Sequence, residues 1–285
     1  MQPFDAFEAR VMDSNYSFLL KPTQFFLLVI STLLIAAGGY IINDIEDVKI
    51  DKLNKPVKKQ IVGRQISLRK TWILYTALTL VGFFISVYLA NFVHRFDQLV
   101  IYPAAVLLLY AYSHWFKKMP LIGNLVVSFF CAFVAWIIVY AQALKPQEIR
   151  IVPGWGVKKH AYVLIGYTLF AFISTLFREI IKDIEDVVGD KAGECKTLPI
   201  VFGIKITKVI VFCVGITLLV CVYFFSKIID VSFKFFLIHL LISIPILFAL
   251  YKLFYAKEKK DFAFLSQFAK LIMLSGLIFI LVMRL

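Results

Sequence analysis

Eight long apolar runs constrain the fold of this chain more than any other feature of its sequence. Each is close to the ~20 residues that an α-helix needs to cross a bilayer, although the third is short. They cover residues 25–42, 72–92, 99–115, 121–143, 161–177, 206–225, 231–255 and 262–283. Hydrophobic residues make up 61% of the chain, which is typical of a polytopic membrane protein and not of a soluble domain. We therefore predict an all-α, polytopic transmembrane helical bundle with eight spans.

We expect one membrane-embedded domain over residues 1–285, preceded within that range by a mildly polar surface segment at 1–24. This segment has no charged stretch followed by an apolar run and a cleavage site, so it does not resemble a signal peptide. Pro245 lies inside the seventh apolar run and should interrupt the helix there, because proline lacks a backbone N–H.

The charge of the chain fits a membrane protein better than a nucleic-acid-binding protein. The net charge is +13, but the lysines and arginines gather after the first, third, fifth and seventh runs. By the positive-inside rule these loops face the cytoplasm, and they are too small to grip a duplex. The basic loop at 145–160 is an exception on the predicted outer side. We predict an integral protein of the cell (inner) membrane with no nucleic-acid partner.

The cysteines indicate neither disulfides nor a zinc site. Three of the four lie inside apolar runs, and none shows the spacing of metal ligands. They are Cys131, Cys195, Cys213 and Cys221.

A short acidic stretch occurs twice, each time at the end of an apolar run. NDIEDVKIDK covers residues 43–52, and KDIEDVVGDK covers residues 182–191. The copies align without a gap, and in each the aspartates fall at i, i+3 and i+7. On a helix these positions lie within a sector of roughly 60°, with the intervening glutamate on the other side. The two triads are Asp44, Asp47 and Asp51, and Asp183, Asp186 and Asp190.

Both triads are predicted on the cytoplasmic side, where they can act together. Carboxylates beside hydrocarbon are costly unless they are paired or bind a metal ion. Oxygen ligands without histidine or cysteine favour a hard ion, so Mg²⁺ is the first choice and Ca²⁺ the second. Six carboxylates exceed the needs of one ion, which favours two or three Mg²⁺ bridging a diphosphate. Polar residues that can complete the metal shell or clamp phosphate oxygens are Asn43, Arg178, Lys182, Lys117 and Lys118.

These residues resemble a known family. NDIEDVKID, with NKP and IVGRQIS after it, is similar to the first motif of the UbiA-type intramembrane prenyltransferases. REIIKDIEDVVGDKAGECKTLPIVFG is similar to their second motif, and with KKMPLIGNLVVS it most resembles the branch that makes digeranylgeranylglyceryl phosphate. The resemblance extends over nearly the whole chain from residue 25.

The resemblance implies a helical bundle with a central cavity capped by cytoplasmic loops. Mg²⁺ held by Asn43 and the two triads would bind a prenyl diphosphate, and Asp47 and Asp186 would be essential for catalysis. Tyr112 and Lys117 match a tyrosine-to-lysine motif of the family, with Lys118 as a competitor for the lysine. Lys52 and Lys191, which align, are further candidates for substrate binding.

The implied reaction joins a prenyl group, for this branch geranylgeranyl, to the hydroxyl of a prenylglycerol phosphate and forms an ether lipid. Other branches prenylate aromatic rings of quinone precursors or a haem, so an aromatic acceptor is the alternative. A different class also fits the repeats, namely a cation-coupled carrier. Carriers, however, place acidic ligands near the bilayer midplane, and here they lie at span ends.

The family usually has nine spans and a cytoplasmic N-terminus. The eight runs here place residue 1 outside. Both differences disappear if one helix precedes residue 1, and we expect the chain to lack that helix. The absence of an upstream in-frame apolar segment in the gene would refute a misassigned start.

Overall fold

The computed structural model describes residues 20–48, 51–52, 60–94, 96–142, 155–229 and 236–283. Within these ranges the chain is helical and has no β-strand, only an isolated bridge between Val62 and Ile66. The all-helical prediction is confirmed. Most of the predicted surface segment, residues 1–19, and most of the predicted outer loop, residues 143–154, lie outside the described residues.

The helices follow the predicted apolar runs in order. The longer ones are α2 (Pro22–Glu46), α4 (Leu68–Phe92), α5 (Ile101–His114), α6 (Ile122–Gln142), α7 (Trp155–Ala192), α9 (Gly203–Ile229), α11 (Ile244–Tyr255) and α12 (Lys259–Met283). The short ones are η2 (Phe96–Val100), η3 (Phe116–Lys118), α8 (Leu198–Val201) and η4 (His239–Ser243).

Six helical segments of the described chain are long and apolar enough to cross a membrane. They lie in α2, α4, α7, α9, the stretch from η4 to α11, and α12. The third predicted span corresponds to α5, which has only 14 residues. Large apolar side chains also face outward, for example Leu107 and Phe254 at 67% and 71% exposure. The protein is therefore an integral membrane protein, while the count of eight spans stays a prediction.

Helix α7 continues well beyond the apolar run that predicts it. That run ends at residue 177, whereas the helix extends to Ala192 and carries the whole second acidic motif in its last turns. Hydropathy marks only the part of a helix suited to hydrocarbon. The polar continuation is helical because an ion pair one turn apart, Lys182 with Asp186, supports it. Helix α2, by contrast, ends at Glu46, with Asp47 as its C-cap.

The predicted interruption at Pro245 is confirmed. A π-helical turn, η4, directly precedes α11, and Pro245 occupies the first turn of that helix. The helical stretch is continuous from residue 236 to 255, and the wider π-helical turn accommodates the proline, which has no N–H to donate to the preceding turn.

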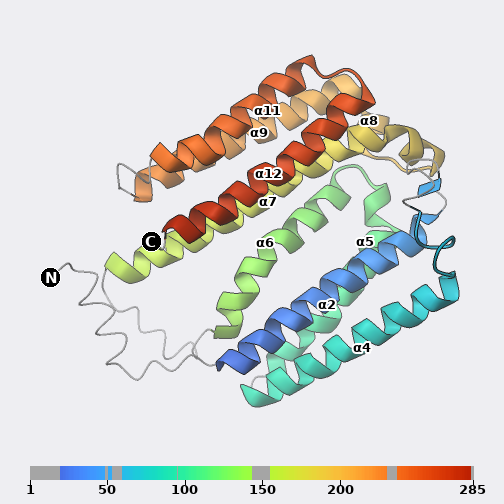
Figure 1. Ribbon diagram of the computed structural model, residues 1–285, viewed down its shortest axis with the longest axis vertical. Coiled ribbons are helices and arrows are strands. Elements are labelled where there is room, and N and C mark those ends of the chain that lie inside the picture. The colour runs from blue at the N-terminus through green and yellow to red at the C-terminus, as the bar shows by residue number, and fades with distance from the viewer. Residues whose placement is uncertain are drawn as a thin grey trace.

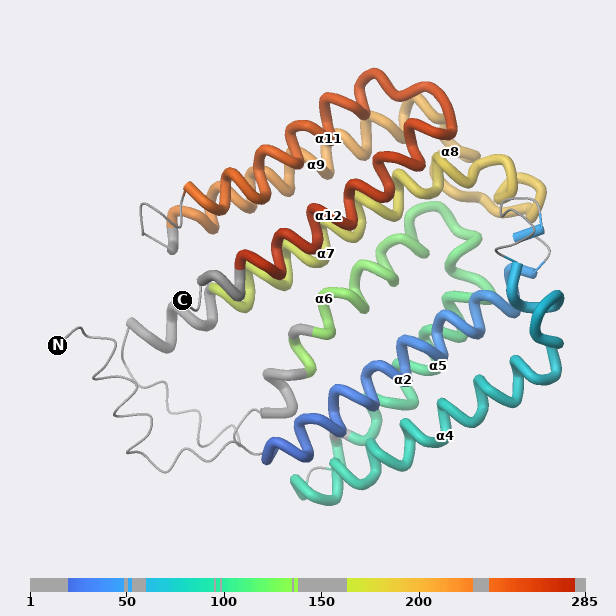
Figure 2. The backbone as a smooth tube through the Cα atoms, viewed as in Figure 1, coloured from blue at the N-terminus to red at the C-terminus, as the bar shows by residue number. Residues whose placement is uncertain are grey.

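The long helices form two groups (Figure 1). Helices α2, α4 and α5 pack together, and α7 packs against α9 and α12 in the other group. Helix α6 lies against α7 and joins the groups. The tube in Figure 2 shows α2 and α7 running in the same direction, so the ends that carry the acidic motifs lie at the same end of the bundle.

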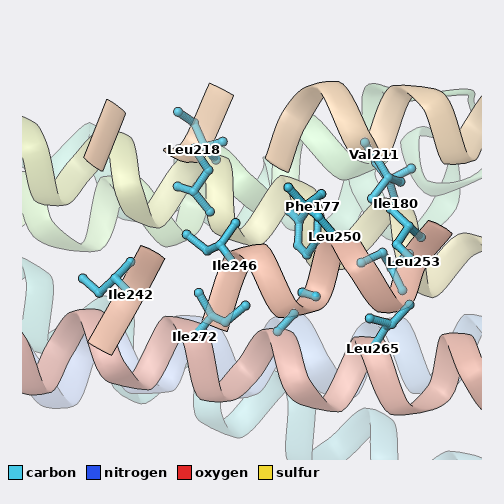
Figure 3. Close-up of a cluster of buried hydrophobic side chains, with 14 of the residues drawn as sticks. Phe177, Ile180, Val211, Leu218, Ile242, Ile246, Leu250, Leu253, Leu265 and Ile272 are labelled. Atoms are coloured by element: carbon cyan, nitrogen blue, oxygen red, sulfur yellow. The ribbon is translucent and has the colours of Figure 1, made fainter. Parts of the chain in front are cut away.

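The main core lies in the second group. Figure 3 shows buried side chains from α7, α9, η4, α11 and α12 meeting one another, among them Phe177, Leu218, Ile246, Leu253 and Ile272. A smaller cluster around Leu28 and Leu89 joins α2 and α4.

Candidate functional site

The first acidic motif is bound by a lysine from a different part of the chain. Lys117, in η3 between α5 and α6, donates from Nζ to Asp47 Oδ1 at 2.5 Å and to Asn43 Oδ1 at 3.3 Å. Asn43 Nδ2 in turn donates to Asp47 Oδ2 at 2.9 Å. The side chains of Lys117 and Asp47 are only 10% and 18% exposed, so the charges neutralise each other in a largely buried setting.

The other two aspartates of the first motif line a cavity of about 310 Å³. Its wall also includes the basic residues Lys52 and Arg64. Asp51 remains in helical register with Asp47, because its N–H donates to the Asp47 carbonyl oxygen at 2.7 Å. The predicted helical spacing of these two residues is therefore present, and the cavity provides a polar space beside the motif.

In the second motif, each of the first two aspartates has a different kind of partner. Asp183 accepts a hydrogen bond from Asn124 Nδ2 of α6 at 3.0 Å. Asp186 forms an ion pair with Lys182 one turn earlier. Asp190 lies beside the turn that follows α7, where the Thr197 side chain interacts with its carboxyl group. The end of α7 therefore holds a mixture of charged and neutral contacts.

Two neighbouring groups indicate that the triads lie close together. Burial raises the pKa of the Cys195 thiol to about 11, and the carboxylates of Asp190 and Asp47 add to the effect. The Cys195 thiol is therefore close enough to both motifs to interact with a carboxylate of each. Tyr112 of α5 also interacts electrostatically with Asp47, Asp183 and Asp190. The predicted tyrosine is therefore near enough to carboxylates of both motifs to interact with them electrostatically.

The structure distinguishes between the candidate lysines and places the candidate arginine. The Lys117 side chain reaches Asp47, whereas Lys118 is exposed and contacts the second motif's loop through its backbone, accepting from Lys196 N at 2.8 Å. Lys191 is exposed in the last turn of α7. Arg178 pairs with Glu179, and its Nε is buried without a hydrogen-bond partner in the described part of the chain.

Two contacts at this end of the bundle are not evident from the sequence. In the sequence, Asn124 is a polar residue near the start of the apolar run at 121–143, yet in the structure its amide donates to Asp183. Glu46 contacts His114 of α5, with 3.1 Å between Oε1 and Nε2, and the His114 ring stacks on Tyr110. The periodicity of one helix does not show which residues of α5 and α6 contact α2 or α7. The sequence would have predicted the two contacts only if histidine or asparagine were already known to pair with the acidic motifs.

The residues of the first motif fit a hard cation, although no metal site is complete. Among the described residues, no three carboxylate, imidazole or thiol groups converge to hold a metal ion. The Lys117 ammonium is itself a cation, however, and it is held by oxygens of Asn43 and Asp47. Carboxylate and amide oxygens are also the ligands that Mg²⁺ prefers. The donor set is therefore suited to Mg²⁺.

Comparison with known proteins gives consistent relatives. The chain is 37% identical over 189 residues to the digeranylgeranylglyceryl phosphate synthase of Sulfurisphaera tokodaii, a match covering 66% of this chain and 61% of the relative. It is 34% identical over 192 residues to the synthase of Sulfolobus acidocaldarius, covering 65% and 60%. The chain thus spans about three fifths of the length of these relatives.

Solved structures share the fold. A structure described as a digeranylgeranylglyceryl phosphate synthase in membranes aligns with a TM-score of 0.62 at 23% identity, over 92% of this chain and 88% of that one. A UbiA homologue from Aeropyrum pernix aligns with a TM-score of 0.67 at 17% identity, over 91% and 90%. A UbiA homologue from Archaeoglobus fulgidus bound to GPP and Mg²⁺ aligns at 0.61 and 15% identity, over 91% and 88%.

Residues 15–274 match the UbiA prenyltransferase family. This range includes both acidic motifs and the turn η3, which carries Lys117. With this match over most of the chain, and with the same fold in the solved structures, the protein belongs to the UbiA prenyltransferase family.

Proposed function

We propose that this protein is an Mg²⁺-dependent prenyltransferase. It transfers a prenyl group, which we propose to be geranylgeranyl, to the hydroxyl of a prenylglycerol phosphate. The product is an ether lipid. The observation that carries the proposal is the meeting of Lys117 with Asp47 at the end of the bundle where the second acidic motif also lies. Oxygen ligands and ammonium groups together form a site suited to a diphosphate.

Each candidate residue has a role in this proposal. The two triads, with Asn43, would hold Mg²⁺. Lys117 and Lys182 would then bind diphosphate oxygens. Arg178, whose buried Nε has no hydrogen-bond partner among the described residues, would donate to the same group. Tyr112 lies beside the reacting carbon. Lys52, with Arg64, binds the phosphate of a lipid at the cavity near Asp44 and Asp51, and Lys118 and Lys191 attract the anionic substrates from solution.

The reaction breaks the bond between the allylic carbon and the diphosphate oxygen, and the diphosphate leaves with the electron pair. The acceptor oxygen forms the new bond to that carbon and loses its proton. Bound Mg²⁺ neutralises charge on the leaving diphosphate. The lysines and Arg178 add positive charge on the same oxygens, and the low exposure of Lys117 and Asp47 keeps bulk water from the site.

Several observations support this reaction over the alternatives. The relatives at 37% and 34% identity are digeranylgeranylglyceryl phosphate synthases, which favours a glycerol phosphate lipid over an aromatic acceptor. An A. fulgidus structure with the same fold holds GPP and Mg²⁺, which favours the metal and the diphosphate donor. The acidic residues lie at helix ends, unlike the mid-membrane ligands of a carrier. The basic loops favour a cytoplasmic location for the site.

The test is a product analysis with the purified chain in lipid nanodiscs. Geranylgeranyl diphosphate and Mg²⁺ are supplied with geranylgeranylglyceryl phosphate, with an aromatic carboxylic acid, or with no acceptor. Diphosphate release and a lipid ether, detected by mass spectrometry, are expected only with the glycerol phosphate lipid. Release that needs the aromatic acid would establish the alternative acceptor. No release with any acceptor, across donors of several chain lengths, would refute prenyl transfer.

A further inference from the structure

The turn that carries Lys117 lies directly on the beginning of α6. A Cβ atom added at Gly123 would be 2.8 Å from the Lys117 Cα and 3.0 Å from the Phe116 carbonyl oxygen, and both of these atoms belong to the backbone. Leu121, just before the helix, has a φ of 65°, which marks a tight reversal of the chain. Only glycine at position 123 allows this approach, so the position of Lys117 depends on the start of α6.

The next residue of α6 reaches the second acidic motif. Asn124 is 7% exposed, and its Nδ2 donates to Asp183 Oδ2 at 3.0 Å. Its own carbonyl oxygen accepts from Ser128 Oγ at 2.6 Å. Gly123 and Asn124 therefore contact the two halves of the site from adjacent positions, one through the Lys117 backbone and the other through the Asp183 carboxylate.

The partner of Asp183 differs in charge from the partners of Asp47 and Asp186. Those two carboxylates face the ammonium groups of Lys117 and Lys182. The amide hydrogen bond orients the Asp183 carboxyl group without placing a competing cation on it, so its oxygens remain accessible to a metal ion. Neutral second partners of this kind fix the orientation of metal-binding carboxylates in metalloproteins.

We propose that Asn124 is a positioning residue, which orients Asp183 for the cation, and that Gly123 sets its spacing from Lys117. The start of α6 thereby couples the lysine turn to the second acidic motif. This inference rests on the proposed function, because it assigns the cation to a diphosphate-binding site. Asn124 itself touches neither the substrate nor the metal ion.

The test measures metal binding directly. Mn²⁺ replaces Mg²⁺ as the probe, and its binding to the protein in nanodiscs is followed by electron paramagnetic resonance without substrate. The variants are Asn124→Leu and Asn124→Ala, which both remove the amide; the alanine cannot overfill the site. Asn124→His restores an N–H donor at the same distance from the backbone. Ser128→Ala is the matched control, because it removes a buried hydrogen bond one turn further along α6.

Loss of the amide should weaken Mn²⁺ binding and raise the Mg²⁺ concentration for half-maximal turnover by about 10–100-fold. Asn124→His should recover most of this loss, and Ser128→Ala should bind Mn²⁺ as the parent protein does. Parent-like Mn²⁺ affinity in Asn124→Ala would overturn the inference, as would an equal loss in Ser128→Ala. If the parent protein binds neither Mn²⁺ nor prenyl diphosphate, the proposed function fails instead, so the two failures are distinguishable.

Discussion

At the scale of single residues, Lys117 and Asp47 form the contact on which the proposed function rests. Both side chains are mostly buried, and a buried charge left without its partner is strongly unfavourable. The Lys117 ammonium supplies the positive charge that balances Asp47 in this buried setting. In the proposed reaction, the same ammonium would bind a diphosphate oxygen.

Lys117→Met should lower kcat by about 10²–10³-fold, because one preorganised donor to the leaving group is lost while the side-chain stem remains. The methionine also removes a competitor for Asp47, so Mn²⁺ affinity in the absence of substrate should not fall. Steady-state kinetics and Mn²⁺ titration measure the two effects. Lys118→Met is the matched control, since Lys118 is exposed, and its kcat should fall far less than that of Lys117→Met. Equal losses in both variants would contradict the assignment of Lys117.

Asp47→Asn and Asp186→Asn should each abolish turnover, because in the proposed function both motifs hold the cation, while helical circular dichroism stays unchanged. Asp261→Asn is the control outside the site. Its carboxylate accepts from the backbone N–H groups of Lys257 and Glu258, both at 2.9 Å, at the start of α12. That variant should keep the turnover of the parent protein per folded molecule. Mg²⁺-dependent activity in either site variant would count against the assigned roles.

At the scale of helices, glycines determine how closely neighbours approach. An added Cβ at Gly82 of α4 would lie 2.0 Å from the hydroxyl oxygen of Tyr102, a buried side chain that donates to the Thr79 carbonyl oxygen at 3.0 Å. At Gly38 of α2 the nearest atom would be 3.7 Å away, which is ordinary contact. Sequence alone presents both as glycines in apolar runs, but only Gly82 has no room for a methyl group.

Gly82→Ala should destabilise the protein by about 1–3 kcal/mol, because Tyr102 must leave its position between α4 and α5. Gly38→Ala should change stability little, since space is available and alanine favours the helix. Thermal unfolding in the same detergent, with ligand absent, compares the two variants. A larger loss for Gly38→Ala would show that the packing of α2, α4 and α5 differs from that described here.

At the scale of the whole molecule, the direction of the helices brings the chemistry together. Helices α2 and α7 end at the same side of the bundle, and α6 connects the two helix groups beside them. By the positive-inside rule, the basic loops predict that this side faces the cytoplasm, and this orientation stays a prediction. Both substrates of the proposed reaction have polar heads, and they would meet the site at that membrane surface with their tails among the helices.

The orientation can be tested by labelling single cysteines on membrane vesicles. In a background without the four native cysteines, Lys260→Cys at the motif end should react with a membrane-impermeant maleimide only in inside-out vesicles. Phe96→Cys, in η2 of the loop that follows α4 and is predicted to lie outside, should react only in right-side-out vesicles. Both positions are well exposed, with the Lys260 side chain at 77% and Phe96 at 60%. The reverse pattern would place the site outside the cytoplasm.

Much of the fold could be predicted because a membrane helix can be recognised from the residues of its own segment. Apolar length predicts the order of the helices, and Pro245 predicts the interruption before α11. The repeated aspartates identify both motifs. Hydropathy did not predict where α7 ends. The helix continues beyond the apolar run, through the second motif to Ala192, because polar residues with favourable pairing also form helix.

The sequence by itself determined the helical class, the membrane location and the identity of the two acidic motifs, since these depend on composition and on spacing within one segment. Only the tertiary structure decided that Lys117 and not Lys118 reaches Asp47, that Asn124 holds Asp183, and that His114 holds Glu46. These contacts join residues up to 70 positions apart. No local pattern specifies such pairs, because they depend on how whole helices pack and on which way a short turn directs its side chains.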